Sequence, residues 1–297
     1  MTCELIVDAR NATGESPVWR PAEQALYWVD IPERQLHRWR AEDGAHHTWQ
    51  ADEMLACIAP RARSEGGWIA GMQSGVFHLD MNASGTLDSQ LVSPVEHALE
   101  GMRFNDGRCD RQGRFWAGTM LMDMQQGAQV GALYRQDGHA LPLSLQLDGM
   151  IVPNGLAFSP DGTRMYLSDS HPQVQTIWVF DYDIDSGVPC NQRVFVDMRQ
   201  YPGRPDGAAI DQDGCYWICG NDAGQVHRFT PDGRLDRSLS VPVKKPAMCA
   251  FGGAGLDTLF VTSIRPSGMD LCDQPLAGGV FALNPGTRGV EEPAYRG

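Results

Sequence analysis

Three polar residues occupy matching positions in similar short segments that lie far apart in the sequence. Glu15 occurs in "GESPVW", Asn154 in "VPNGLAFSPDG" and Asp206 in "RPDGAAID". Each has a proline within two residues, which restricts the local backbone. Two carboxylates and one amide oxygen form a hard-oxygen set of the kind that binds a divalent cation, with water completing the shell. We therefore expect a metal site if the fold brings these residues together.

The same residues also have a simpler interpretation. Asn, Asp and Glu beside Gly or Pro commonly form turns and bond their own backbone. For a single residue of this kind, a turn is the better explanation. Three of them in the same phase of a repeat favour the metal site.

These segments belong to a repeat that runs along the whole chain. Each unit combines a strand-like run, a Gly-containing turn and an aromatic-rich strand. The six units are "GESPVWRPAEQALYWVD", "LACIAPRARSEGGWIAGMQSGVFHLD", "FNDGRCDRQGRFWAGTM", "VPNGLAFSPDGTRMYLSDS", "RPDGAAIDQDGCYWICGNDAGQVHRF" and "KPAMCAFGGAGLDTLFVTSIRP". Their period of roughly 50 residues is typical of blade repeats, in which one unit supplies a four-stranded sheet.

The repeat predicts an all-β fold, a six-bladed β-propeller with four-stranded blades that forms a single domain over residues 1–297. In such a ring the innermost strands begin at one mouth of the central channel, which would bring Glu15, Asn154 and Asp206 together. The ring must close to protect its edges, so we expect the N-terminal strand in "CELIVDA" to complete the last blade. A β-sandwich with chance similarity among its hairpins is the alternative.

Composition excludes several classes of partner. The formal net charge is -13, which repels phosphate backbones and anionic membranes, and no Lys/Arg cluster reverses it locally, so we expect no nucleic-acid partner. No apolar run is long enough to span a bilayer, and the start lacks the features of a signal segment, so we expect a cytoplasmic protein. The eight cysteines include no C-x-x-C pair and are expected to be reduced.

The quoted segments, together with "FNDGRCDRQGRFWAGTM", resemble the signature segments of the SMP-30/gluconolactonase family, which includes regucalcin and bacterial sugar lactonases. The similarity runs nearly end to end, with the motifs in family order. It implies a six-bladed propeller with one catalytic divalent metal bound by Glu15, Asn154 and Asp206. It also implies that Arg103 and Asn105 hold substrate hydroxyls beside the metal.

Two further residues are candidates for substrate contact. Several relatives carry an acidic residue just after the "AGTM" segment, where this chain reads "LMDMQQ", and Asp123 is the nearest acidic equivalent. His171 in "SDSHPQ" follows Asn154 by one strand and could reach the same pocket.

The resemblance implies a hydrolase that opens sugar lactones, because a hard cation can polarise an ester carbonyl that water attacks. Asp206 is the general base implied by the family, and a metal-bound hydroxide is the competing base. Oxygen ligands favour Ca²⁺, with Mg²⁺, Mn²⁺, Zn²⁺ or Fe²⁺ as alternatives. A calcium-binding regulatory propeller without turnover and an esterase on a similar ring are the other functions considered.

The formal charge of the predicted pocket favours one class of lactone substrate over another. Glu15, Asp123 and Asp206 around one dication give a formal charge of about -1, which disfavours an anionic substrate. Arg204 is expected to point away from the mouth, because Pro205 fixes the strand between it and Asp206. We therefore predict neutral aldono-1,4- or 1,5-lactones as substrates, with aldarolactones as the rival class, and a monomer or weak homo-oligomer.

Overall fold

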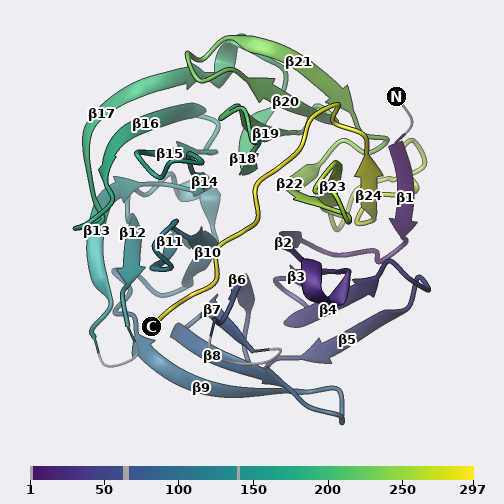
Figure 1. Ribbon diagram of the computed structural model, residues 1–297, viewed down its shortest axis with the longest axis horizontal. Coiled ribbons are helices and arrows are strands. Elements are labelled where there is room, and N and C mark those ends of the chain that lie inside the picture. The colour runs from purple at the N-terminus through teal and green to yellow at the C-terminus, as the bar shows by residue number, and fades with distance from the viewer. Residues whose placement is uncertain (1–2, 63–66, 139–140) are drawn as a thin grey trace.

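Six antiparallel sheets of four strands each are arranged in a ring (Figure 1). The computed structural model describes residues 3–62, 67–138 and 141–297. The sheets confirm the predicted six-bladed β-propeller with four-stranded blades. The turn of the second sequence unit, residues 63–66, lies outside the described residues.

Each of the first five blades uses four strands that follow one another in the chain, from the centre of the ring outward. The strands are β1 (Cys3–Val7), β2 (Gly14–Arg20), β3 (Ala25–Asp30), β4 (Gln35–Arg40), β5 (His46–Gln50), β6 (Leu55–Pro60), β7 (Trp68–Met72), β8 (Gly75–Met81), β9 (Leu87–Pro94), β10 (Met102–Cys109), β11 (Phe115–Leu121), β12 (Gly131–Gln136), β13 (Ser144–Met150), β14 (Pro153–Phe158), β15 (Arg164–Asp169), β16 (Thr176–Asp183), β17 (Val188–Asp197), β18 (Arg204–Ile210), β19 (Tyr216–Asn221), β20 (Gln225–Phe229), β21 (Leu235–Ser240), β22 (Pro246–Gly252), β23 (Thr258–Ser263) and β24 (Val280–Leu283). Three short 3-10 helices connect them: η1 (Pro21–Glu23), η2 (Met124–Gln126) and η3 (Met198–Gln200).

The ring closes through its first strand. β1 pairs with β24 as the outermost strand of the sixth blade, with Leu5 opposite Phe281. This pairing confirms the prediction that the N-terminal strand completes the last blade, and it leaves that sheet with a full set of four strands. The residues after β24 then cross the middle of the ring in Figure 1 and end near β11 and β12.

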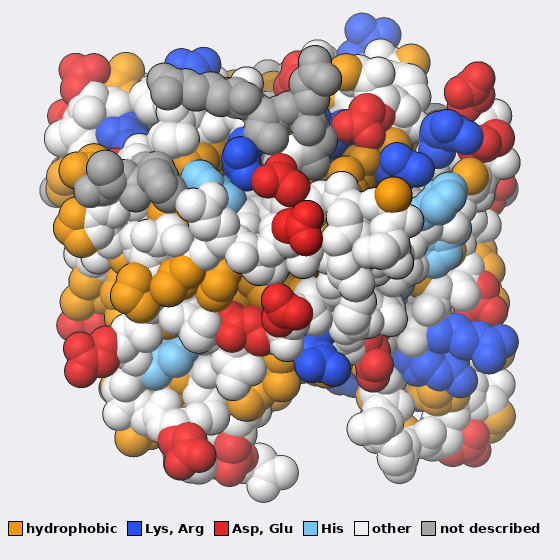
Figure 2. All heavy atoms as spheres, turned by 90° about the horizontal axis from the view of Figure 1, so that it is seen from below, with side chains coloured by type: hydrophobic (Ala, Val, Ile, Leu, Met, Phe, Trp, Pro, Cys, Tyr) orange, Lys and Arg blue, Asp and Glu red, His pale blue; other side chains and the backbone are white. Residues whose placement is uncertain are grey.

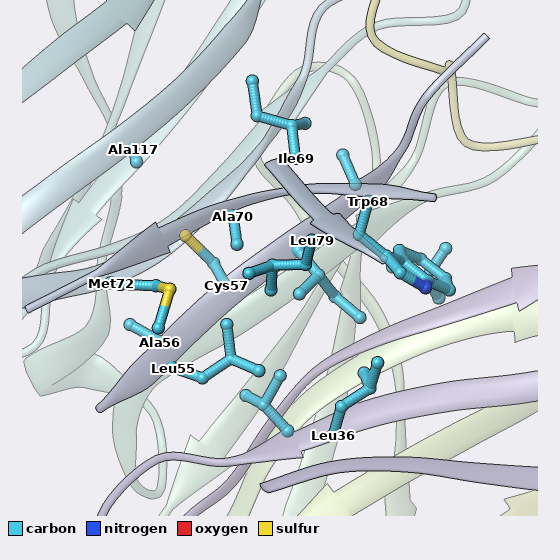
Figure 3. Packing of buried hydrophobic residues seen from close by; sticks show 14 of the residues in the cluster. Leu36, Leu55, Ala56, Cys57, Trp68, Ile69, Ala70, Met72, Leu79 and Ala117 are labelled. Atoms are coloured by element: carbon cyan, nitrogen blue, oxygen red, sulfur yellow. The ribbon is translucent and has the colours of Figure 1, made fainter. Parts of the chain in front are cut away.

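The aromatic residues of the repeat fill the spaces between blades. Trp28, Trp68, Trp116 and Trp217 stand in the second strands of their blades and are fully buried. Figure 3 shows side chains of β6 and β7 packed together, with Leu36 of the first blade and Ala117 of the third on opposite sides. One sheet cannot bury both faces alone, so this packing is what makes the repeat a single ring.

Charged side chains of both signs lie on the rim of the ring. In the face that Figure 2 shows, acidic, basic and apolar side chains are interspersed. Among the described residues, no helix is long and apolar enough to cross a membrane. All eight cysteines are free, and five of them are buried, as expected for reduced core residues.

Candidate active site

A cavity of about 410 Å³ lies where the innermost strands begin. Five residues singled out in the sequence line it: Glu15, Arg103, Asn105, Asn154 and Asp206. They come from β2, β10, β14 and β18, which belong to four different blades. The ring therefore brings these distant segments to one mouth of the propeller.

An irregularity in each strand aims these side chains. The pairing register with the second strand shifts just after Glu15 in β2 and just after Asn154 in β14. In β18 the shift follows Pro205, so Asp206 lies within the bulge itself. A β-bulge bends a strand and redirects its side chains, which explains why residues of a buried strand can face the channel mouth.

The backbone directly after two of these residues is left-handed. Ser16 has φ 50° and Gly155 has φ 61°. A Cβ at position 155 would lie 2.4 Å from the Tyr216 hydroxyl, which donates to the Gly155 carbonyl at 2.7 Å, so only glycine fits. Ser16 adopts the less favourable conformation while its Oγ accepts from the Ile58 amide at 2.9 Å. Backbone strain of this kind concentrates at functional sites.

Two oxygen atoms of the candidate metal ligands have no hydrogen-bond partner among the described residues. They are Glu15 Oε2 and Asn154 Oδ1, and both are buried. Asn154 Nδ2 donates to Ser170 Oγ at 2.6 Å, which fixes the amide so that its oxygen stays free. Leaving a buried acceptor unpaired costs about 1–3 kcal/mol. A bound cation would remove this cost, so the donor set fits a hard divalent ion.

Asp206 is held by a residue that the sequence did not single out. Its Oδ2 accepts from Asn221 Nδ2 at 2.5 Å, and Asn221 Oδ1 is another buried oxygen without a partner in the described chain. Asn221 ends β19 as Asp30 ends β3 and Asp169 ends β15, but the carboxylates of Asp30 and Asp169 accept backbone amides instead. The repeat register was the signal that could have identified this position.

The acidic residues of the cavity are costly to ionise. Burial raises the pKa of Glu15 well above its usual range, and the charges of Asp206 and Asp106 raise it further. Burial also raises the pKa of Asp206 to about 7, although the Asn221 hydrogen bond and the Arg204 charge lower it. No group of three or more His, Cys, Asp or Glu side chains in the described ranges could hold a metal, so the candidate set is two carboxylates with one amide. A dication between them would compensate both charges.

Arg103 is tied to the candidate ligands through Asn105. Its Nη1 donates to the Phe104 carbonyl at 2.6 Å and to Asn105 Oδ1 at 2.9 Å. Asn105 Nδ2 donates to the Pro153 carbonyl at 3.0 Å, directly before Asn154 in the chain. Burial lowers the pKa of Arg103 to about 10, so the guanidinium remains a cation at neutral pH. A fixed cation therefore stands beside the free oxygens.

Asp123 and His171 are not among the residues that line this cavity. Asp123 is exposed, and its carboxylate accepts from the amide of Gln125 at 3.2 Å and from the side chain of Gln126, which caps η2. His171 is buried, and its Nε2 lies 3.0 Å from the Met124 carbonyl. Both hold the segment that carries Met124, itself a lining residue, and their substrate contacts stay predictions.

Two basic residues that were not expected at the cavity line it. Arg204 was expected to point away from the mouth, but its side chain faces the cavity. Its Nε donates to Asp222 Oδ2 at 2.7 Å and its Nη1 to the Ser170 carbonyl at 3.1 Å, and these contacts turn it inward. Lys245, just before β22, also lines the cavity and donates to Asp222. The charge sum made from the sequence was therefore wrong.

The rest of the wall is largely apolar and includes Met54, Met120, Met122 and Met124. Methionine side chains are flexible and adapt to ligands of different shape. The cavity thus combines a charged floor with an adaptable wall, which suits a small polar molecule that also presents carbon surface.

The chain matches a family model described as the SMP-30/Gluconolactonase/LRE-like region over residues 13–265. The chain belongs to this family. Its 6-deoxy-6-sulfogluconolactonase relative from Pseudomonas putida is 41% identical and is aligned over 100% of this chain and 99% of that one. The L-arabinolactonase of Azospirillum brasilense is 35% identical, over 99% and 95% of the two chains.

A solved structure of a family member has the same fold. The calcium-binding protein regucalcin from Agrobacterium tumefaciens superposes with a TM-score of 0.90 at 29% identity, covering 99% of this chain and 97% of that one. The resemblance seen in the sequence motifs is therefore confirmed by family membership over most of the chain.

Proposed function

We propose that this protein is a metal-dependent hydrolase that opens sugar lactones to the corresponding sugar acids. The observation that carries the proposal is the pair of unpartnered buried oxygens, Glu15 Oε2 and Asn154 Oδ1, in a cavity that Asp206 and Arg103 also line. Two family relatives that align over nearly the whole chain are named as lactonases, which supports the same reaction here.

Glu15, Asn154 and Asp206 would hold one divalent ion, whose chemistry when bound is to polarise the ester carbonyl and to stabilise the charge that develops on its oxygen. The related regucalcin is described as a calcium-binding protein, which supports Ca²⁺. Mg²⁺, Mn²⁺, Zn²⁺ and Fe²⁺ are the alternatives that an assay must compare.

The protein side chains have separate roles in this proposal. Arg103 donates hydrogen bonds to sugar hydroxyls, and Asn105 keeps its guanidinium in place. Asp206 takes a proton from the attacking water as the new bond to the carbonyl carbon forms. When the bond between that carbon and the ring oxygen breaks, the proton passes to the leaving ring oxygen, which becomes the hydroxyl of the acid product. Asn221 orients Asp206 for this transfer.

The proposed substrates are aldono-1,4- or 1,5-lactones, with aldarolactones as the rival class. Both named relatives act on lactones of aldonic acids according to their names. A cytoplasmic location and a monomeric or weakly associated state remain predictions from the sequence.

A pH-indicator assay tests the proposal. Gluconolactone, galactonolactone and an aldarolactone are compared with an aryl ester, before and after removal of metal with a chelator. We expect lactone hydrolysis that is lost with the chelator and restored by a divalent ion. Metal binding without hydrolysis of any lactone would favour the second candidate, a calcium-binding regulatory propeller, which the name of the related regucalcin supports.

A further inference from the structure

Three basic residues occupy the same place in three blades. Arg103, Arg204 and Lys245 each stand immediately before the residue at which the first strand pair changes register: Phe104, Pro205 and Pro246. All three line the cavity. Arg204 and Lys245 belong to the neighbouring fifth and sixth blades, whereas Arg103 belongs to the third blade, across the mouth from Lys245.

Arg204 and Lys245 form a pair with one shared partner. Arg204 Nε donates to Asp222 Oδ2 at 2.7 Å, and Lys245 Nζ donates to the other oxygen of the same carboxylate. Their side chains are 20% and 21% exposed, so both are held at the wall and not extended into solvent. The pair is therefore preorganised before any ligand arrives.

Both cations keep donors that no hydrogen bond among residues 3–62, 67–138 and 141–297 uses. The hydrogen bonds that fix Arg204 use Nε and Nη1, so its Nη2 amino group is not needed to hold the guanidinium. An ammonium has three donors, and Asp222 needs only one from Lys245. These free donors can reach a ligand group without breaking the shared contact.

The charge of the residues that line the cavity favours an anionic ligand group at these donors. The charged residues that line the cavity are three bases, Arg103, Arg204 and Lys245, and two acids, Glu15 and Asp206, a formal balance of +1. Asp222 reduces this balance to zero, and one bound dication raises it to about +2. The chain as a whole carries -13, so a balance of zero before any dication binds already makes this cavity less negative than the protein's overall field.

We propose that Arg204 and Lys245 form a subsite for an anionic group, a sulfonate or a carboxylate, at the far end of the lactone substrate. The proposal rests on the proposed lactonase function and specifies its substrate class. Arg103 and the metal candidates act at the ester end, and the pair beside Asp222 receives the other end. A lactone with a neutral terminal hydroxyl offers the remaining donors of this pair no anionic acceptor, so it is the poorer substrate.

The test compares three substrates: 6-deoxy-6-sulfogluconolactone, a glucarolactone and neutral glucono-1,5-lactone. The protein variants are Arg204→Gln and Lys245→Met. Lys244→Met is the matched control, because Lys244 pairs with Asp273, is exposed and does not line the cavity, yet its loss changes the net charge equally.

Each cavity variant should lower kcat/KM for the anionic substrates by about ten- to a hundredfold, mainly through KM, and for the neutral lactone by less than threefold. The Lys244→Met protein should match the unmodified protein on all three substrates. The sulfonate and carboxylate arms show which anion the subsite prefers. Equal losses on charged and neutral lactones, or a neutral lactone preferred by the unmodified protein, would overturn the subsite.

A binding measurement keeps this result separate from the proposed reaction. Calorimetry with the ring-opened acids, 6-deoxy-6-sulfogluconate against gluconate, measures the subsite without turnover. Tighter binding of the sulfonated acid that Lys245→Met removes supports the subsite even if no lactone is hydrolysed, in which case the lactonase proposal alone fails. Equal binding of the two acids in the unmodified protein contradicts the subsite. Thermal unfolding of each variant confirms that the variant is folded. If Arg204→Gln does not fold, the comparison with Lys245→Met alone tests the subsite.

Discussion

The two mouths of the propeller use buried carboxylates in opposite ways. At the cavity mouth, Glu15 keeps an oxygen without any partner in the described chain. At the other ends of the same innermost strands, Asp211 accepts from the amides of Asp213 and Cys215, the Trp217 indole and the Arg228 guanidinium. The sheets are equivalent, so the difference lies in which atoms surround each carboxylate.

The second mouth is also covered by the end of the chain. Residues after β24 cross the ring in Figure 1, and the Tyr295 amide donates to the Pro60 carbonyl at 2.8 Å. Glu292 of this segment accepts from Arg108 at 3.0 Å. The carboxylates of Asp211 and Glu292 are thus paired with protein atoms where the ring is sealed, whereas Glu15 keeps an oxygen without a partner among the described residues where a ligand can enter. One end of the propeller contributes stability and the other supplies binding chemistry.

The largest effect should come from removing a buried carboxylate at the sealed end of the propeller. Asp211→Ala leaves Arg228 buried without its main partner, which should lower the free energy of unfolding by about 3–5 kcal/mol. Urea unfolding followed by fluorescence measures this. Asp213→Ala removes an exposed partner of the same arginine and should cost less than about 1 kcal/mol. Similar costs for both variants would contradict the comparison.

At the open end, Asp206→Ala should remove activity and leave the fold. We expect kcat/KM for a lactone to fall at least about a hundredfold, equivalent to about 3 kcal/mol, together with loss of bound metal by elemental analysis. The unfolding temperature of the metal-free protein should change little, because the substitution also removes a charge that repels Glu15. Asp232→Ala, an exposed change in the same blade, is the control. Full activity and full metal content in Asp206→Ala would show that the site lies elsewhere.

A smaller effect is expected from Arg103. It lies at the open end of the propeller, so we expect it to bind substrate and to contribute little to stability. Arg103→Ala should lower kcat/KM about tenfold, mainly by raising KM, with little change in thermal unfolding. Steady-state kinetics and calorimetric unfolding on the same preparation separate the two roles. Unchanged kinetics with a clear loss of stability would make Arg103 a structural cation.

The outer strands of the first blade give a prediction about how stability depends on pH. Burial, together with the charge of neighbouring His46, lowers the pKa of His37 to about 3. Because His37 stays neutral in the folded protein while it gains a proton when unfolded, its contribution to stability is present above about pH 6.5 and is lost as the pH falls toward 3.

The slope from this residue approaches about 1.4 kcal/mol per pH unit, the limit for one proton. Urea midpoints measured between pH 7 and pH 5 should fall less steeply in His37→Gln. His47→Gln should keep the slope of the unmodified protein, because His37 is still present. An unchanged slope in His37→Gln would show that other groups cause the acid loss.

The sequence was sufficient to predict the fold because its information is repeated. A turn followed by an aromatic strand occurs in six units, and each copy supports the same assignment, so the propeller and the closure by β1 follow without any long-range contact. Glu15, Asn154 and Asp206 occupy matching positions in their repeat units, and this predicts that they lie at one mouth of the ring. The sequence also contains a signal for Arg204 and Lys245, because the segments "RPDG" and "KPAM" each begin a unit with a basic residue before a proline.

Only the tertiary structure decided which of these side chains enter the cavity. Side-chain direction depends on the exact register of each bulge and on contacts between blades, neither of which a local pattern contains. Arg204 turns inward because Asp222 and the Ser170 carbonyl hold it, and Asp123 turns to cap η2. The raised pKa of Asp206 likewise depends on burial that arises when the ring closes. The periodic sequence determined the ring and the level of the site within it, and packing between distant segments determined its charge.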